Sequence, residues 1–157
     1  MTIQTIDTKK SLIGTPRPHY LIGDAFYSLE GGEHVLRSKV FFPSDEEHPS
    51  ILDRGPGKYL EHPHVNVGDG CFATWNGAHI LAEILGYQFR ILKDEGIWKV
   101  GRSPIVPNTE LDLETRVKET RSVERNGITH VEGTVTGKFS HHGEHKLTIT
   151  SSYYAKK

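Results

Sequence analysis

The densest group of residues able to transfer protons lies between positions 59 and 70, where the sequence is YLEHPHVNVGDG. His62 and His64 belong to the one side-chain type whose ordinary pKa lies near neutral pH, so each can accept or donate a proton. Glu61 and Tyr59 add a carboxylate and a phenol beside them. An apolar run typical of a helix follows directly, so these groups are expected to stand at a helix start. The alternative is a polar loop that only caps that helix.

The helix start itself offers a second kind of chemistry. The first N–H groups of a helix have no partner within it and lie at the positive end of its dipole, so they can hold a carbonyl oxygen or an anion. We expect the N–H groups of Gly70 and Cys71 to act as these donors, with Asn66 beside them and Gly68 allowing close approach of a ligand. The Cys71 thiol is either an activated nucleophile or a small packing residue.

Two polar residues, Asn76 and His79, lie inside the apolar run and share one helical face. A buried amide or imidazole without a partner costs about 1–3 kcal/mol, so each requires a hydrogen-bond partner or a ligand. Both are therefore candidates for a site. The alternative is that they bond to neighbouring backbone, across a contact between subunits.

Other side chains indicate which ligands to expect. On charge alone, the candidates for binding a carboxylate or a phosphate are Arg37, Lys58 and Arg102. His62-Pro63-His64 has no third ligand nearby, so we expect no metal. The remaining clustered histidines surround an expected turn and are interpreted as solvated: His141, His142 and His145. None of the glycine-rich, phosphate-binding, serine-hydrolase or zinc-protease motifs occurs, so we expect no cofactor.

The elements that must position these residues follow from the hydrophobic pattern. Asp69 is the expected N-cap of a helix over 71–85, and Gly86 suits its left-handed C-cap. Residues 1–19 are expected to be an irregular arm, and 43–57 a loop. The expected strands are 20–30, 34–42, 98–106, 111–118, 129–139 and 147–153. Tight turns are expected at Gly31-Gly32, Asn126-Gly127 and His142-Gly143.

A sheet with one buried face requires a cover, and the only cover here is the central helix. The sequence therefore predicts an α+β hot-dog fold, in which a curved antiparallel β-sheet wraps around one long central α-helix. A lipocalin-type barrel is the rival, but such a barrel has no buried helix at its middle. We expect a homodimer or a dimer of dimers, because edge-to-edge pairing would cover the exposed sheet edge.

Length and composition limit the class of protein. The chain has 157 residues, which favours one domain, here assigned to 20–157. A net charge of -1 argues against a general nucleic-acid binder. The one cysteine cannot form a disulfide within the chain. There is no signal-like segment at the N-terminus and no apolar run of membrane-spanning length, so a cytoplasmic protein with no membrane partner is expected.

Several segments together resemble the FcoT-like family of hot-dog acyl-thioester enzymes. The resemblance covers most of the chain from Tyr20 onward and rests on the segments 20–28, 58–60, 64–66, 75–76 and 101–104. It implies that Tyr59 and Asn76 are functional, and it includes Trp75. Where a family member has a further tyrosine one turn after the asparagine, this chain has Ile80, with His79 next to it.

Two activities are attributed to that family: hydrolysis of long-chain acyl thioesters, and addition of glycine to the β-carbon of a (2E)-enoyl thioester. The second gives an N-carboxymethyl-3-amino acyl thioester, which can then be hydrolysed. The histidine-rich stretch favours glycine addition, because the amine needs a base. The resemblance thus implies an acyl carrier protein or coenzyme A thioester and glycine as partners.

The expected roles follow from this interpretation. The catalytic candidates are Tyr59, His62, His64, Asn76 and His79. The substrate-binding candidates are Asn66, Gly70, Cys71, Trp75, Arg37, Lys58 and Arg102. A simple thioesterase, a non-catalytic acyl-carrier binding module and a dehydratase remain as alternatives. The dehydratase is disfavoured because Glu83, the only acid well inside the helix, lies at a late, surface-like position.

Overall fold

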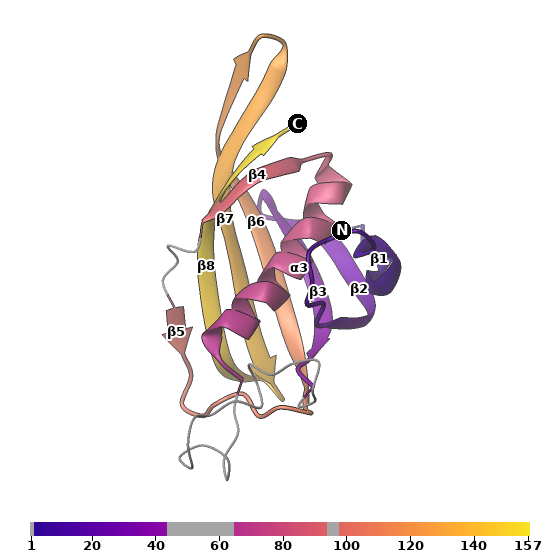
Figure 1. Ribbon diagram of the computed structural model, residues 1–157, viewed down its shortest axis with the longest axis vertical. Coiled ribbons are helices and arrows are strands. Elements are labelled where there is room, and N and C mark those ends of the chain that lie inside the picture. The colour runs from indigo at the N-terminus through magenta and orange to yellow at the C-terminus, as the bar shows by residue number, and fades with distance from the viewer. Residues whose placement is uncertain (1, 44–64, 94–97) are drawn as a thin grey trace.

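The computed structural model describes residues 2–43, 65–93 and 98–157, with a single curved sheet and one long helix. Its elements are β1 (Gln4–Asp7), α1 (Thr8–Ser11), β2 (Leu21–Glu30), β3 (Glu33–Phe41), α3 (Val67–Leu85), β4 (Gln88–Lys93), β5 (Trp98–Val100), β6 (Glu110–Arg125), β7 (Ile128–His141) and β8 (Glu144–Lys156). The strands form one sheet in the order β1-β2-β3-β6-β7-β8-β4, and β5 also pairs with β8. Every pairing is antiparallel, and α3 crosses the face of the curled sheet (Figure 1). The predicted architecture is confirmed.

The strands after the helix form where the sequence alternates with period two. Along β6, Leu111, Leu113 and Val117 are buried on the face toward α3. The three predicted tight turns are also confirmed, because both residues of each have a positive φ: Gly31-Gly32, Asn126-Gly127 and His142-Gly143. Asparagine and glycine tolerate this conformation, which is why these turns are visible in the sequence.

The helix α3 begins earlier than predicted. Its N-cap is Asn66, whose Oδ1 accepts the Asp69 N–H at 2.9 Å, so the prediction that Asp69 is the N-cap is wrong. Asp69 lies instead in the first turn, where the helix dipole favours a carboxylate and where the Tyr20 hydroxyl donates to its Oδ1 at 2.6 Å. Gly86 ends the helix with φ 68°, as predicted. Among the described residues, no helix combines the length and the apolar character that a membrane crossing requires.

Small residues bring α3 close to the sheet. A Cβ placed on Gly77 would lie 2.3 Å from the Thr115 Oγ1 of β6, and one placed on Gly137 of β7 would lie 2.2 Å from the Thr74 Oγ1. A Cβ on Gly70 would lie 2.7 Å from Leu147 of β8. Helix and sheet therefore touch through paired glycine and threonine positions, which fixes where the helix start lies relative to β8.

Gly77→Ala should destabilise the protein, although alanine is about 1 kcal/mol better than glycine inside a helix. The added methyl meets Thr115, which is fully buried and β-branched, so overpacking of about 1–3 kcal/mol should exceed that gain. In the Thr115→Ala background the same change should cost less, because the contact with the Thr115 Oγ1 is gone and only the one with its Cβ, at 2.9 Å, remains. Chemical denaturation of the four proteins of this double-mutant cycle measures the coupling, and additive effects would contradict this packing account.

The N-terminal segment is not the irregular arm that we expected. β1 pairs with residues 24–27 of β2, and α1 follows it directly. Ile6 and Leu12 are buried, and the Thr8 hydroxyl donates to the Gly23 carbonyl at 2.7 Å. A four-residue edge strand is stabilised by its pairing partner rather than by its own pattern, so it leaves little signal in the sequence. For the same reason β4 was not predicted, and β5 is shorter than the expected strand 98–106.

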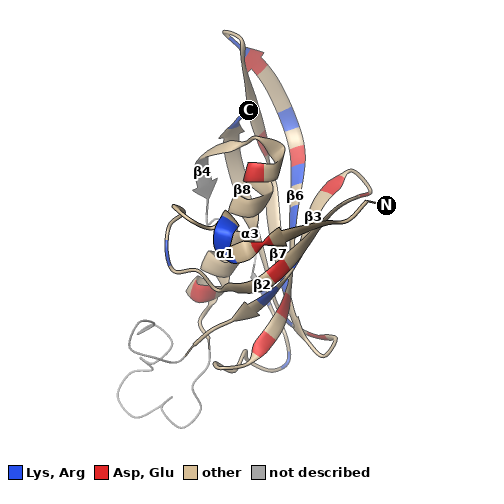
Figure 2. Ribbon diagram, turned by 90° about the vertical axis from the view of Figure 1, so that its right-hand side faces the viewer, with Lys and Arg blue, Asp and Glu red and all other residues tan. Residues whose placement is uncertain are grey.

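The face of the sheet away from α3 carries charged side chains along β3 and β6 (Figure 2). Arg37 pairs with Glu30 and Glu114, and Arg116 pairs with Glu114 and Glu33. Each of these side chains is between a fifth and a half exposed. The part of this face formed by β3 and β6 therefore meets solvent, and the buried apolar core lies under α3.

Candidate functional site

A groove of about 520 Å³ opens at the N-terminal end of α3. Three segments form it: residues 65–67 at the helix start, residues 100–105 at the end of β5 and just after it, and residues 146–147 of β8. Its apolar lining is Val65, Val67, Val100, Pro104, Ile105 and Leu147. Its polar lining includes Asn66, Arg102, Ser103 and Lys146. The groove can therefore hold an apolar chain beside a cationic and hydrogen-bonding wall.

A β-bulge and a glycine shape this groove. The β7–β8 register shifts between Phe139 and Ser140, which leaves Lys146 of β8 without an opposite residue. The next segment lies directly on this bulge, because the Gly101 N–H donates to the Lys146 carbonyl at 2.8 Å. A Cβ on Gly101 would lie 2.1 Å from the His145 carbonyl oxygen, so only glycine fits. Bulges turn side chains away from the regular alternation, and here the bulge directs Lys146 into the groove wall.

The helix start carries backbone donors at Val67, which lines the groove, and at Gly68, the next residue along the chain. The N–H groups of Val67 and Gly68 have no hydrogen-bond partner among the described residues, and Gly68 is exposed. The Gly70 N–H donates to the Asn66 carbonyl at 3.3 Å, so the prediction of a Gly70 donor is wrong. Cys71 follows within the helix, where each N–H bonds four residues back, so it is not a donor either. The donors lie at Val67 and Gly68 because the cap is at Asn66 rather than Asp69.

The cationic wall contains a linked set of side chains that the sequence analysis did not single out. The Lys146 ammonium donates to the Ser103 hydroxyl, which donates to the Glu144 carboxylate at 2.9 Å. Lys146 also lies 3.8 Å from Glu144. The Lys146 side chain is 11% exposed and the Glu144 side chain 56%. Arg102, one of the predicted substrate-binding residues, lines the same groove and is exposed.

Comparison with known proteins shows the fold alone. No protein-family model matches the sequence, and no curated protein is significantly similar to it. The yhdA protein of Lactococcus lactis, described as a candidate thioesterase, superposes with a TM-score of 0.52 at 11% identity, over 85% of this chain and 90% of its own. An HP0420 homologue from Helicobacter felis superposes with a TM-score of 0.51 at 12% identity, over 94% of this chain and 88% of its own. The chain has a hot-dog fold. Membership of the FcoT-like family stays a prediction.

Asn76 of this hot-dog chain is engaged in structural bonds. Its Oδ1 accepts the Tyr20 N–H at 2.8 Å, and its Nδ2 donates to the Pro18 carbonyl at 3.2 Å. The residue is 2% exposed. It lies nine residues after Val67, or about 14 Å along the helix at 1.5 Å per residue. The structure thus pairs Asn76 with backbone, as the alternative interpretation held, but with backbone of its own chain.

His79 and Trp75 of α3 are both half-buried. The His79 ring meets Phe89 edge-on at 5.8 Å, and Trp75 meets Phe72 at 5.3 Å. His79 is about 18 Å along the helix from Val67. Neither residue therefore reaches a group bound at the helix start of its own chain. Cys71, 4% exposed, packs in the core under the helix.

His79 should make the protein less stable in mild acid. Burial, and then the positive charge of His19, lowers the pKa of His79 below its ordinary value of 6.5. The unfolded chain then binds more protons than the folded one, so the free energy of unfolding should fall as the pH drops below about 6.5. His79→Gln should flatten this slope in denaturation series from pH 7.5 to about 5. An unchanged slope in His79→Gln would contradict the assignment.

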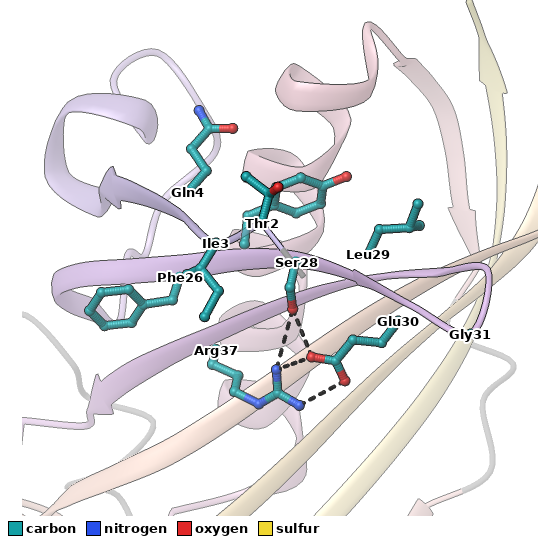
Figure 3. A pocket seen from close by; sticks show the side chains of 10 residues that line it. Thr2, Ile3, Gln4, Phe26, Ser28, Leu29, Glu30, Gly31 and Arg37 are labelled. Carbon is teal, nitrogen blue, oxygen red and sulfur yellow. Dashed lines mark hydrogen bonds and ion pairs between the residues drawn. The ribbon is translucent and has the colours of Figure 1, made fainter.

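A larger hollow, of about 1040 Å³, lies at β1, β2 and β3, and Arg37 is one of the residues that line it (Figure 3). Arg37 lies on the opposite face of β3 from the buried Leu36, so the sheet separates it from α3. Its guanidinium pairs with both Glu30 oxygens, at 3.0 Å for Nη2–Oε2, and with Glu114. Arg37 is therefore not part of the groove at the helix start, and its charge is already matched by carboxylates.

Some of the other predicted residues lie within the described ranges, and some lie outside them. Asn66 lines the groove, and its role in substrate binding stays a prediction. Glu83 is exposed, which agrees with the surface position expected for it. Four predicted site residues and one candidate base lie outside the described residues: Lys58, Tyr59, His62, His64 and Glu61. They immediately precede Val65, whose N–H donates to the Ile105 carbonyl at 2.9 Å on the groove wall.

Proposed function

We propose that this protein is an acyl-thioester enzyme that adds glycine to the β-carbon of a (2E)-enoyl group carried on an acyl carrier protein. The observation that carries the proposal is the groove at the N-terminal end of α3, where apolar walls and cations meet the Val67 N–H, which has no partner in the part of the chain that the structure describes. The apolar lining suits an acyl chain. The Val67 and Gly68 N–H groups suit a thioester oxygen, because they lie at the positive end of the helix dipole.

In the proposed reaction the free amine of glycine attacks the β-carbon, and a new N–C bond forms. The π electrons of the double bond move to the thioester oxygen, which becomes an enolate oxygen held by the two N–H groups. The nitrogen loses a proton, and the α-carbon gains one. His62, His64 or Glu61 is the proposed base, because the sequence places all three just before the groove-lining Val65. Tyr59 remains a candidate for holding the substrate.

Hydrolysis is the second candidate, because the same donors can hold the oxyanion that forms when water attacks the thioester carbonyl. The description of yhdA as a candidate thioesterase favours this reaction by analogy of fold alone. Hydrolysis after glycine addition would release the free N-carboxymethyl-3-amino acid. Both reactions use one oxyanion site, and they differ in whether an amine or a water is the nucleophile.

The test is incubation with a medium-chain (2E)-enoyl carrier protein, with and without glycine, followed by intact mass measurement. Glycine addition predicts a carrier heavier by one glycine, formed only when glycine is present. Loss of the acyl group without glycine would establish a plain thioesterase. Gain of water without an amine would establish a hydratase, the reverse of the dehydratase reaction. An unchanged carrier in all arms, with saturable binding, would leave the non-catalytic binding module.

The partners that we propose together with this activity are a carrier protein or coenzyme A thioester, glycine, and a second copy of the chain. Saturated acyl carrier protein is the matched control for the enoyl substrate, since it keeps the carrier and the thioester but lacks the double bond. A glycine adduct on the saturated substrate would contradict conjugate addition.

A further inference from the structure

We propose that Lys146 and Ser103 form a seat for a small anionic group of the substrate, and that this group is the carboxylate of glycine. The inference rests on the proposed function, because it assigns the cationic wall of the same groove to one of that reaction's two substrates. Carboxylates and phosphates share the chemistry that such a seat recognises, namely anionic oxygens that accept several charged hydrogen bonds. A phosphate on the carrier arm is therefore the other source to be tested.

The position of Lys146 is the first argument. The Lys146 side chain is only 11% exposed and lines the groove beside Leu147. A lysine this buried needs partners, and the described ones are a neutral hydroxyl, on Ser103, and a carboxylate 3.8 Å away, on Glu144. Lys146 lies at the bulge in β8, and Gly101 packs against that bulge and donates its N–H to the Lys146 carbonyl. An ammonium group has three N–H donors arranged around one charge, so it can hold Ser103 and an anion at the same time.

Glu144 shows that the donors fit a carboxylate. Its Oε1 accepts the Ser103 hydroxyl at 2.9 Å and lies 3.8 Å from the Lys146 Nζ. The Glu144 side chain is 56% exposed and follows directly on the exposed turn His142-Gly143, so it can rotate into water. The pair is long, at 3.8 Å, and its carboxylate is more than half exposed, so a substrate carboxylate can replace Glu144 at little cost. Glu144 is then a built-in competitor for the seat.

The burial of Lys146 favours the carboxylate of glycine over the phosphate of the carrier arm as the anion bound there. A carrier protein stays outside the groove, so the phosphate at the far end of its long arm belongs at the exposed rim, where Arg102 lies. The carboxylate of glycine is one carbon away from its amine. Bound at Lys146, it would keep the amine inside the groove, beside an enoyl chain whose carbonyl oxygen is at the helix start.

Binding can be measured apart from catalysis. Thermal unfolding with glycine, with glycinamide, which lacks the carboxylate, and with inorganic phosphate should show stabilisation of the wild type by glycine and not by glycinamide. Lys146→Met should lose the glycine effect, and Lys146→Arg should keep part of it. Glu144→Gln should raise the apparent affinity for glycine by 2–5-fold, because it removes the competitor. Lys99→Met, an exposed lysine on β5 outside the groove lining, is the control and should behave as wild type.

Kinetics then distinguish the two sources of the anion. With enoyl carrier protein, Lys146→Met should raise KM for glycine at least 10-fold, roughly the loss of one charged contact, and leave KM for the carrier within 2-fold. A rise in KM for the carrier, absent with an enoyl N-acetylcysteamine thioester that has no phosphate, would assign the seat to phosphate and overturn the glycine assignment. Equal constants for Lys146→Met and Lys99→Met would overturn the seat itself.

The results that would contradict the proposed function differ from those that would contradict the anion seat. If the wild type forms no glycine adduct but Lys146-dependent anion binding persists, the reaction is wrong and the seat stands for another anion. If the adduct forms and Lys146→Met neither weakens glycine binding nor raises its KM, the reaction stands and the seat is wrong.

Discussion

Val67→Pro is expected to lower turnover of the thioester by about 10²–10³-fold while the protein stays folded, because it deletes one backbone donor of the oxyanion site. Val67 is the first residue of α3, and its N–H has no partner among the described residues. Proline is favoured at that position, since it removes only an N–H that the helix does not use. The preceding residue must be extended, and Asn66 already is, with φ -82° and ψ 164°.

Val67→Ala is the matched control, because it removes most of the same side chain from the groove but keeps the N–H. Its turnover should stay within a few-fold of the wild type, and the melting temperatures of the two variants should agree within a few degrees. Steady-state rates measured on both, with circular dichroism to confirm the helix, separate the donor from the side chain. Equal activity of Val67→Pro and Val67→Ala would remove the helix start from the mechanism.

Asn76→Ala is expected to destabilise the protein by about 2–4 kcal/mol, a melting-temperature loss of roughly 5–15 °C. The change leaves the Tyr20 N–H and the Pro18 carbonyl without the side chain that now pairs with both. Each buried group left unpaired costs about 1–3 kcal/mol. Differential scanning calorimetry and chemical denaturation give the stability, and turnover measured well below the melting temperature gives the activity.

Asn76→Asp separates the two roles proposed for this residue. It keeps an oxygen to accept the Tyr20 N–H but loses the donor to Pro18, so a structural Asn76 should give an intermediate stability and near-normal turnover at low temperature. A catalytic Asn76, as the family resemblance implies, predicts instead that both variants lose turnover while Asn76→Ala keeps the wild-type melting temperature. The hydrogen bonds to residues 18 and 20 favour the structural role.

Predictions from the sequence succeeded where the signal is local. Period-two alternation marked β6, β7 and β8, and residue pairs that tolerate positive φ marked three turns. The long apolar run between Asp69 and Gly86 marked α3 as the element that covers the sheet. Each of these signals depends on backbone preferences of a few neighbouring residues, which the sequence displays directly.

Predictions about the site failed where the outcome depended on competition between neighbours. Asn66 and Asp69 are both good N-caps, and the choice was made by Tyr20, whose hydroxyl binds the Asp69 carboxylate inside the first turn. That shift of three residues moved the candidate oxyanion donors from Gly70 and Cys71 to Val67 and Gly68. Likewise Asn76 found its partners in backbone more than fifty residues away, at positions 18 and 20.

The amino-acid order alone determined a curved antiparallel sheet around one buried helix, with a polar stretch leading into the helix, because alternation, turns and caps are properties of adjacent residues. Only the tertiary structure decided that Lys146 belongs to the groove. Period two places it on the face opposite Leu147, but a bulge against Phe139 and Ser140 lets both line the same cavity. A bulge is set by the register between two strands and by Gly101 lying on it, and neither is visible in the local sequence of β8.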